Sequence, residues 1–244
     1  MIKIDSNIDT KRKYEIHIFG DSHSKCFFRD KSLSIDNIKL YNNYKSSASM
    51  KGLTNTDSTL DYSKTIEKIL KQTQPSNSDV NTFSIMKFGQ VDVEYNYYFK
   101  VYNKKESINK KEFYKNLVNN YMVYIDNLKI LFPNIKFIIN GLNMPNLYDL
   151  QKYMFNGGVR TMPVIDYENQ FDNHFLFNNE LKIQSELKKI PYFDLTTETT
   201  HNKKIKNEFI GKDNHLSGAE GEPYTNFNTY RVFLNKLFDT IKTN

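Results

Sequence analysis

The stretch Gly20-Asp21-Ser22-His23 follows directly on a short apolar segment, Tyr14-Glu-Ile-His-Ile-Phe19, near the start of the chain. The apolar side chains of that segment predict a central strand that is buried on both faces. A glycine begins the turn after the strand, and such a turn can place a serine at the carboxyl end of an open α/β sheet, where ligands bind. Ser22 is therefore the first candidate for a nucleophile.

A serine nucleophile needs a base, a group that orients the base, and hydrogen-bond donors for the oxyanion. Asp213-Asn-His215 supplies the first two within three residues. In the predicted arrangement, His215 takes the proton from Ser22, Asp213 fixes the tautomer of the imidazole, and backbone amides near Ser22 face the oxyanion. The hypothesis requires the two ends of the chain to meet, which a doubly wound sheet allows.

The rest of the chain alternates between strand and helix patterns. Further strands are predicted over 38–41, 82–88, 135–139 and 191–194, and helices over 59–72, 109–131, 170–188 and 230–241. This alternation predicts an α/β fold with a central parallel sheet of about five strands, covered by helices on both faces. We expect one domain over residues 1–244, with residues 1–12 as an N-terminal extension and 156–169 as a loop over the cleft.

Three more segments are expected at the edge of the sheet where Ser22 lies. Phe88-Gly-Gln-Val-Asp92 ends one predicted strand, and Asn140-Gly-Leu-Asn143 ends another. The loop around Gly52 is rich in small residues, so its backbone can approach a ligand closely, although it can equally be a plain strand-to-helix connection. In the cleft loop, Arg160 is either a contact for an acidic substrate or an ordinary surface charge.

Composition narrows the classes of partner. Lys and Arg number 34 against 28 Asp and Glu, a formal charge of +6. The lysines are spread along a sequence that is also rich in Asn, Ile and Tyr, which is typical of an AT-rich genome, so no nucleic-acid partner is predicted. The single cysteine, Cys26, excludes an internal disulfide, agrees with a reducing compartment, and is read as a packing residue.

No metal, cofactor or membrane partner is predicted either. His174 and His201 have no carboxylate or second histidine at ligand spacing. There is no dinucleotide fingerprint or phosphate-binding glycine loop. We find no apolar run of about 20 residues and no apolar region of a secretory signal, so a cytoplasmic location is expected. The oligomeric state is left open.

At these residues the sequence resembles the SGNH, or GDSL-like, hydrolase superfamily. Ile18-Phe-Gly-Asp-Ser-His-Ser24 matches the first block of that family, and Asp213-Asn-His-Leu-Ser217 resembles the last. Ser46-Ser-Ala-Ser-Met-Lys-Gly-Leu-Thr-Asn55 is similar to the loop of the second block, and Phe88-Gly-Gln-Val-Asp92 resembles the Phe-Gly-Glu-Ile-Asp variant of the third. That variant occurs in members associated with glycan biosynthesis. The resemblance extends from about residue 14 to 218.

The resemblance implies a flavodoxin-like, three-layer α/β/α fold and ester chemistry without a cofactor. The leading hypothesis is a serine-dependent esterase or O-acyltransferase that adds or removes acyl groups, such as acetyl, on a glycan or glycan precursor. Ser22, His215 and Asp213 are the predicted catalytic residues. The residues expected to bind the oxyanion or the substrate are Asp21, Gly52, Gly89, Gln90, Asp92 and Asn143.

Two departures from the family pattern support an alternative hypothesis. Val91 stands where the third block usually carries the asparagine of the oxyanion hole, and the loss of one such donor costs about 100- to 1000-fold in turnover. Gln90 or Asn143 are candidates to replace it. Asp213 also precedes His215 by two residues instead of the commoner three, a spacing similar to that of alginate O-acetyltransferases. The alternative is a catalytically weakened SGNH-fold module that binds or scaffolds glycans.

Overall fold

A six-stranded sheet forms the centre of the molecule. The computed structural model describes residues 12–28, 31–73, 79–146, 166–211, 215–218 and 228–243. The strands of the sheet are β1 (Lys13–Gly20), β2 (Ser32–Ile35), β3 (Ile38–Asn42), β4 (Val80–Lys87), β5 (Ile135–Asn140) and β6 (Tyr192–Phe193). Their spatial order is β2-β3-β1-β4-β5-β6. All neighbouring strands are parallel except β2, which pairs antiparallel with β3 at the edge.

The five parallel strands have the order of a flavodoxin-like sheet, which confirms the predicted fold class. The first of them, β1, lies between the second, β3, and the third, β4. In this topology the order of the strands reverses beside β1, and ligands bind at the carboxyl ends of the strands at that point. Gly20 ends β1 and Lys87 ends β4, and these two residues are register partners. The turn with Ser22 thus leaves the sheet at this point.

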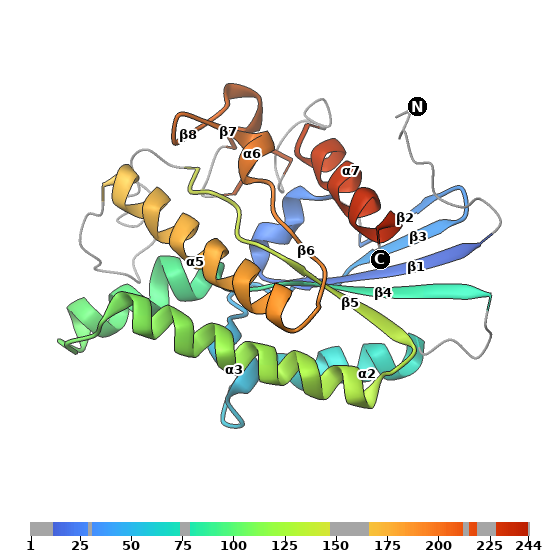
Figure 1. Cartoon of the computed structure of the whole chain (residues 1–244), viewed down its shortest axis with the longest axis horizontal. Helices are drawn as coiled ribbons and strands as arrows, with labels where there is room; N and C mark the ends of the chain where they lie inside the picture. Colours follow the sequence, from blue (N-terminus) through green and yellow to red (C-terminus); the bar gives the residue numbers. More distant parts are fainter. Residues whose placement is uncertain are drawn as a thin grey trace.

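Helices cover both faces of the sheet. The α-helices are α1 (Met50–Thr54), α2 (Tyr62–Thr73), α3 (Lys110–Leu131), α5 (Tyr167–Leu187), α6 (Thr196–Thr199) and α7 (Asn228–Lys242). Shorter helical turns are η1 (Ser22–Cys26), η2 (Asp92–Asn96), η3 (Phe99–Asn103) and η4 (Asn207–Phe209). A small separate hairpin pairs β7 (Thr200–His201) with β8 (Lys204–Ile205). In Figure 1, α7 lies on one side of the sheet, and α2 and α3 lie on the other.

Two hydrophobic clusters hold the three layers together. One packs side chains of α2, α3 and α5 against one face of the sheet, with fully buried residues such as Ile66, Tyr121 and Phe177. The other packs α7 and the turn after β1 against the opposite face, through residues such as Phe27 and Phe233. Because both faces of the sheet are covered, the last five residues of β1 and the last six residues of β4 are all buried.

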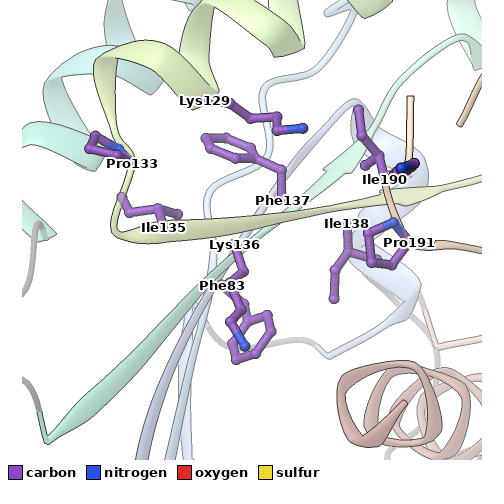
Figure 2. Close-up of a pocket in the computed structure, with 10 residues that line it drawn as sticks. Phe83, Lys129, Pro133, Ile135, Lys136, Phe137, Ile138, Ile190 and Pro191 are labelled. Carbon is purple, nitrogen blue, oxygen red and sulfur yellow. The ribbon is translucent and has the colours of Figure 1, made fainter. Parts of the chain in front are cut away.

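A cavity of about 400 Å³ lies near the beginning of β5. Figure 2 shows its lining, which includes Phe137, Ile190 and Pro191 together with the exposed lysines Lys129 and Lys136. None of the residues predicted to form the functional site lines it. The chemistry predicted from the sequence therefore belongs to the carboxyl ends of the strands and not to this cavity.

Candidate active site

Ser22 begins the helical turn η1 directly after β1. The carboxylate of Asp21 caps this turn, because its Oδ1 accepts a hydrogen bond from the backbone N–H of His23 at 2.8 Å. Gly20 lets β1 and β4 approach closely, since a Cβ there would lie 2.7 Å from the carbonyl oxygen of Lys87. Asp21 is fully buried whereas Ser22 is partly exposed. The turn thus presents the Ser22 hydroxyl at the surface and keeps its own cap inside.

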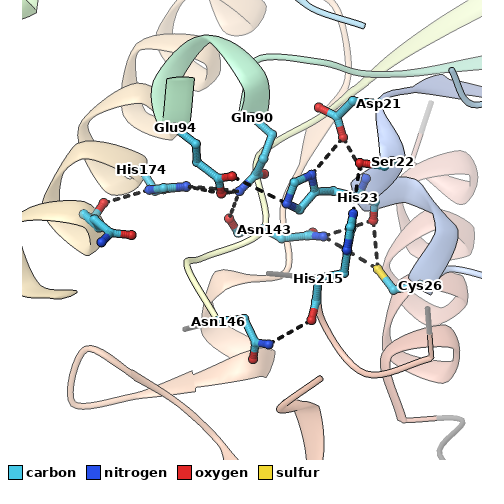
Figure 3. Close-up of polar contacts among 11 residues, drawn as sticks. Asp21, Ser22, His23, Cys26, Gln90, Glu94, Asn143, Asn146, His174 and His215 are labelled. Atoms are coloured by element: carbon cyan, nitrogen blue, oxygen red, sulfur yellow. Dashed lines mark hydrogen bonds and ion pairs between the residues drawn. The ribbon is translucent and has the colours of Figure 1, made fainter. Parts of the chain in front are cut away.

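The side chain of His215 meets that hydroxyl. Its Nε2 lies 2.9 Å from Ser22 Oγ, although the two residues are 193 positions apart in the sequence (Figure 3). Asn146, which lies beyond the end of β5, donates from Nδ2 to the carbonyl oxygen of His215 at 2.9 Å. Next to His215, Leu216 forms a β-bridge with Ile210. The backbone of His215 is therefore fixed from two sides, and its ring is directed at Ser22.

Some of the predicted residues lie outside the described part of the chain. They are Asp213, the predicted partner of His215, and Arg160, in the predicted loop over the cleft. The region predicted as that loop is described only from residue 166 onward, and there it forms the N-cap and first turn of α5.

Asp92 joins two of the segments predicted to converge. Its carboxylate is fully buried and accepts hydrogen bonds from the backbone N–H of Met50 at 2.7 Å and from Asn96 Nδ2 at 2.8 Å. The N–H of Lys51 is 3.4 Å away. Burial raises the pKa of Asp92 to about 6, against the opposing effect of these donors. Asp92 therefore lies behind the site and anchors the loop that leads into α1.

Replacing Asp92 with alanine is expected to destabilise the fold by about 2–4 kcal/mol, because buried donors of Met50 and Asn96 lose their acceptor. The folded pKa lies above the unfolded value, so the folded state binds the proton more tightly and the carboxyl group contributes more stability as the pH falls through 6. The destabilisation should accordingly be about 1 kcal/mol larger at pH 5 than at pH 8. Urea unfolding of both proteins at the two pH values measures this, and an equal or smaller loss at pH 5 would contradict it.

Gly52 and Gly89 both have structural roles in the backbone around the site. The backbone N–H of Gly52 donates to Ser49 Oγ at 3.0 Å, as the capped first turn of α1 requires. Contrary to the prediction, the Gly52 amide is therefore not an open oxyanion donor here. Gly89 has φ +114°, and a Cβ there would come 2.6 Å from a ring carbon of Phe177. Only glycine fits at that position, where β4 turns away from the sheet.

The two amides proposed to replace the family asparagine are also engaged. Gln90 Nε2 donates to the carbonyl oxygen of Asn143 at 3.1 Å and lies 3.0 Å from His174 Nε2. Asn143 Nδ2 donates to the carbonyl oxygen of His23 at 3.3 Å. Both side chains are buried. They hold the neighbouring segments against the turn that carries Ser22.

A network of buried charges lies beside the Ser22–His215 pair. His23 Nδ1 is 3.2 Å from Asp21 Oδ1, and His23 Nε2 is 3.7 Å from Glu94 Oε2. On its other side, Glu94 Oε1 is 3.1 Å from His174 Nε2. Figure 3 shows these groups as a chain from Asp21, the residue after β1, to His174 on α5. Lys87 is fully buried nearby, and no hydrogen-bond partner for its Nζ is found among the described residues.

The pKa values in this network follow from burial and from opposite charges. Burial alone lowers the pKa of His23, but the nearby carboxylates of Glu94 and Asp21 outweigh it, and the pKa is raised. Burial would raise the pKa of Glu94, yet His23 and His174 bring it to about 2. The pKa of Asp21 is lowered despite burial, through His23 and Lys87. Burial lowers the pKa of Lys87.

No protein-family model and no curated protein sequence matches this chain. Solved structures do match it. A carbohydrate acetylesterase from Sinorhizobium meliloti superposes with a TM-score of 0.53 and 12% identity, over 95% of this chain and 99% of the other. An aryl esterase of M. smegmatis gives 0.56 at 11% identity, over 94% and 99%. A GDSL-like lipase from Bacteroides thetaiotaomicron gives 0.53 at 11% identity, over 98% and 92%.

The chain has the SGNH, or GDSL-like, hydrolase fold. The recognition from the sequence is thus confirmed at the level of the fold. Val91 directly precedes η2 as its N-cap residue, and its side chain has no amide to offer. Ser22 lies within hydrogen-bond reach of His215, as predicted, and its neighbour His23 lies 3.7 Å from Glu94 in the segment that contains Asp92.

Four residues of the candidate site were not assigned to it from the sequence. Asn146 holds the backbone of His215, and His23, Glu94 and His174 make up most of the buried charged network. His23 follows Ser22 directly, and Glu94 lies two residues after Asp92. Their closeness to these predicted residues in the sequence could have indicated that they belong to the site. His174 lies 80 residues from Glu94, and no spacing rule brings such a pair together.

The described residues contain no group of three or more histidine, cysteine, aspartate or glutamate side chains arranged to hold a metal ion. None of the helices that the structure describes combines the length and the apolar character needed to cross a bilayer.

Proposed function

We propose that this protein is a serine-dependent esterase or O-acyltransferase that acts on acyl groups, above all acetyl, of a glycan or glycan precursor. The observation that carries the proposal is the 2.9 Å contact between Ser22 Oγ and His215 Nε2 at the carboxyl edge of the sheet. A nucleophile and a base within hydrogen-bond reach are the minimum for acyl transfer. The carbohydrate acetylesterase among the similar folds supports the choice of substrate class.

The proposed reaction has two steps. Ser22 Oγ attacks the acyl carbonyl carbon while its proton passes to His215 Nε2, which gives a tetrahedral intermediate. The bond from carbon to the sugar oxygen then breaks, His215 donates the proton to that oxygen, and the acyl group stays on Ser22. In the second step, water or another sugar hydroxyl loses its proton to His215 and attacks the acyl carbon. The bond from that carbon to Ser22 Oγ then breaks, and His215 returns the proton to Oγ, which restores the free enzyme. Hydrolysis and transfer differ only in this second nucleophile.

Two further roles belong to the proposal. Asp213 lies two positions before His215 in the sequence, and we assign it the task of fixing the tautomer of the ring through Nδ1. The backbone N–H of Ser22 is assigned as an oxyanion donor, since it is the first amide of a helical turn. Asn146 supports the base indirectly, through its hydrogen bond to the His215 carbonyl.

A second candidate function is supported by the same site. Val91 replaces the usual amide, and the amides of Gly52, Gln90 and Asn143 donate to other groups. An oxyanion hole short of one donor loses about 100- to 1000-fold in turnover. The second candidate is therefore an SGNH-fold module that binds glycans and has lost efficient catalysis.

A fluorophosphonate probe tests the leading proposal directly. The wild type is expected to be labelled, Ser22→Ala not at all, and His215→Ala much more slowly, because the probe reports an activated serine. Turnover of aryl acetate and of acetylated xylooligosaccharides, with and without a free sugar acceptor, then distinguishes hydrolysis from transfer. A wild type that is not labelled and turns over no ester would overturn the proposal. Retained binding of the same oligosaccharides would then favour the second candidate.

A further inference from the structure

The residue that follows the nucleophile, His23, packs directly against the base. The ring centroids of His23 and His215 are 4.4 Å apart, with an angle of 40° between the ring planes. His23 is buried, with 3% of its surface exposed. Figure 3 shows the two rings next to Ser22, with the carboxylate of Glu94 on the side of His23 away from His215 and that of Asp21 beside Ser22 and His23. A second histidine therefore lies within contact of the pair proposed to perform the chemistry.

The environment of His23 determines its charge. Each ring nitrogen faces a carboxylate, Nδ1 that of Asp21 at 3.2 Å and Nε2 that of Glu94 at 3.7 Å. A carboxylate only accepts, so carboxylates near both ring nitrogens favour a ring that carries a proton on each of them, which is an imidazolium. The raised pKa of His23, in spite of the effect of burial, agrees with this state.

We propose that His23, held as an imidazolium between Asp21 and Glu94, is a positioning residue that opposes protonation of His215 and so keeps this base ready to accept the Ser22 proton. This inference rests on the proposed esterase function. The contact that transmits the effect is the tilted packing of the two rings, with 4.4 Å between their centroids. A proton on His215 would place two positive charges in van der Waals contact, which the structure disfavours.

The two carboxylates around His23 act in the same direction when it is removed. Asp21 faces it from the end of β1 and Glu94 from η2, and each carries a lowered pKa that keeps it negative. Lys87 faces the network from β4, and His174 contacts the far side of Glu94. Cys26 is neutral because burial raises its pKa to about 12.

Without the His23 cation, two carboxylates would remain near His215 with less positive charge between them. These carboxylates favour a protonated His215. Loss of the His23 cation and exposure of the two anions therefore both make protonation of His215 easier. A unit charge at about 4 Å shifts a titration midpoint by roughly 0.7 of a pH unit even in a water-like medium, and by more in a buried site. This sets the size of the effect to be measured.

The test is the variant His23→Gln, measured by its pH profile of kcat/KM on an aryl acetate. The midpoint of the acid limb is expected to move to higher pH by at least about 0.7 of a unit. A purely structural role would lower the rate at every pH and leave the midpoint in place. His17→Gln is the matched control, because His17 is also buried and pairs with a carboxylate, Glu15 at 3.0 Å, within β1.

A second readout does not depend on turnover. Nitrogen-15 NMR follows the imidazole signals of His215 and His23 with pH in the wild type and in His23→Gln. The His215 midpoint should be higher in the variant, and the His23 signal in the wild type should stay that of an imidazolium at neutral pH. An unchanged or lower His215 midpoint, or a neutral His23 at pH 6, would overturn the inference. If the wild type neither turns over esters nor labels, the proposed function fails while this comparison still decides the coupling of the two rings.

Glu94→Gln keeps the test decisive if His23→Gln does not fold. It keeps the shape of the side chain and removes the charge that holds the second proton of His23. The pH at which His23 loses its proton should fall by at least about 0.8 of a unit, given the 3.7 Å ion pair. No change in that midpoint would show that Glu94 does not hold His23 as a cation, and the inference would be abandoned.

Discussion

Alanine at Ser22 or at His215 is expected to lower kcat for ester turnover by about 10⁴-fold or more. The kcat of the double variant should be no lower than that of the less active single variant. The reason is that the two side chains act as one unit through the 2.9 Å contact between Oγ and Nε2. Without the base, the hydroxyl keeps its proton. Without the hydroxyl, the base has no proton to accept.

A double-mutant cycle on an aryl acetate measures this coupling. Ser34→Ala and His201→Ala are the matched controls, since Ser34 on β2 and His201 on β7 are exposed and lie outside the proposed site. Both should keep wild-type turnover. If the losses at Ser22 and His215 multiply in the double variant, the residues act independently and the proposed mechanism is wrong.

The strands at the centre of the sheet could be predicted because their burial leaves a strong mark on the sequence. β1, β4 and β5 each contain several buried apolar residues, and the turns after them carry the polar residues of the site. The edge strand β2 was missed for the same physical reason. It has only four residues, Ser32–Ile35, none of them buried, so the sheet hardly constrains its composition.

The segment after β4 shows where local patterns give too little information. Its aromatic residues lie on successive helical turns that include η2 and η3. Tyr97 and Tyr98 are buried there and pack against each other at 5.1 Å between ring centroids. Wide helical turns of the π type are rare, and the hydrophobic periodicity of the sequence does not predict them.

In the candidate site, too, some features could be predicted from the sequence and others could not. The meeting of Ser22 and His215 could be predicted, because parallel strands bring their carboxyl ends to one edge. The assignment of Gly52 failed because Ser49, three residues earlier, captures its amide as a helix cap, a local signal that was available. The contact of Glu94 with His23 and His174 could not be foreseen, since it depends on how η2 and α5 are placed in three dimensions.

The largest effect on stability is expected for Phe233→Ala, a loss of about 3–5 kcal/mol. Phe233 on α7 is fully buried and stacks on Phe27, with 3.8 Å between ring centroids and an angle of 7° between ring planes. Phe27 follows η1 directly, and its N–H donates to the carbonyl oxygen of Ser24 at 3.1 Å. α7 therefore supports the turn that positions Ser22, although it carries none of the proposed catalytic residues.

Urea unfolding gives the stability, and kcat/KM on an aryl acetate gives the effect on the site. Phe233→Leu should recover more than half of the lost stability, because it refills most of the cavity. Phe175→Ala is the exposed control: Phe175 is 49% exposed on α5, and its loss should cost less than about 1 kcal/mol. If Phe233→Ala keeps both wild-type stability and wild-type kcat/KM, then α7 does not support the nucleophile turn. If it loses stability but keeps kcat/KM in the folded fraction, the η1 turn holds its shape through Asp21 and the neighbouring strands alone.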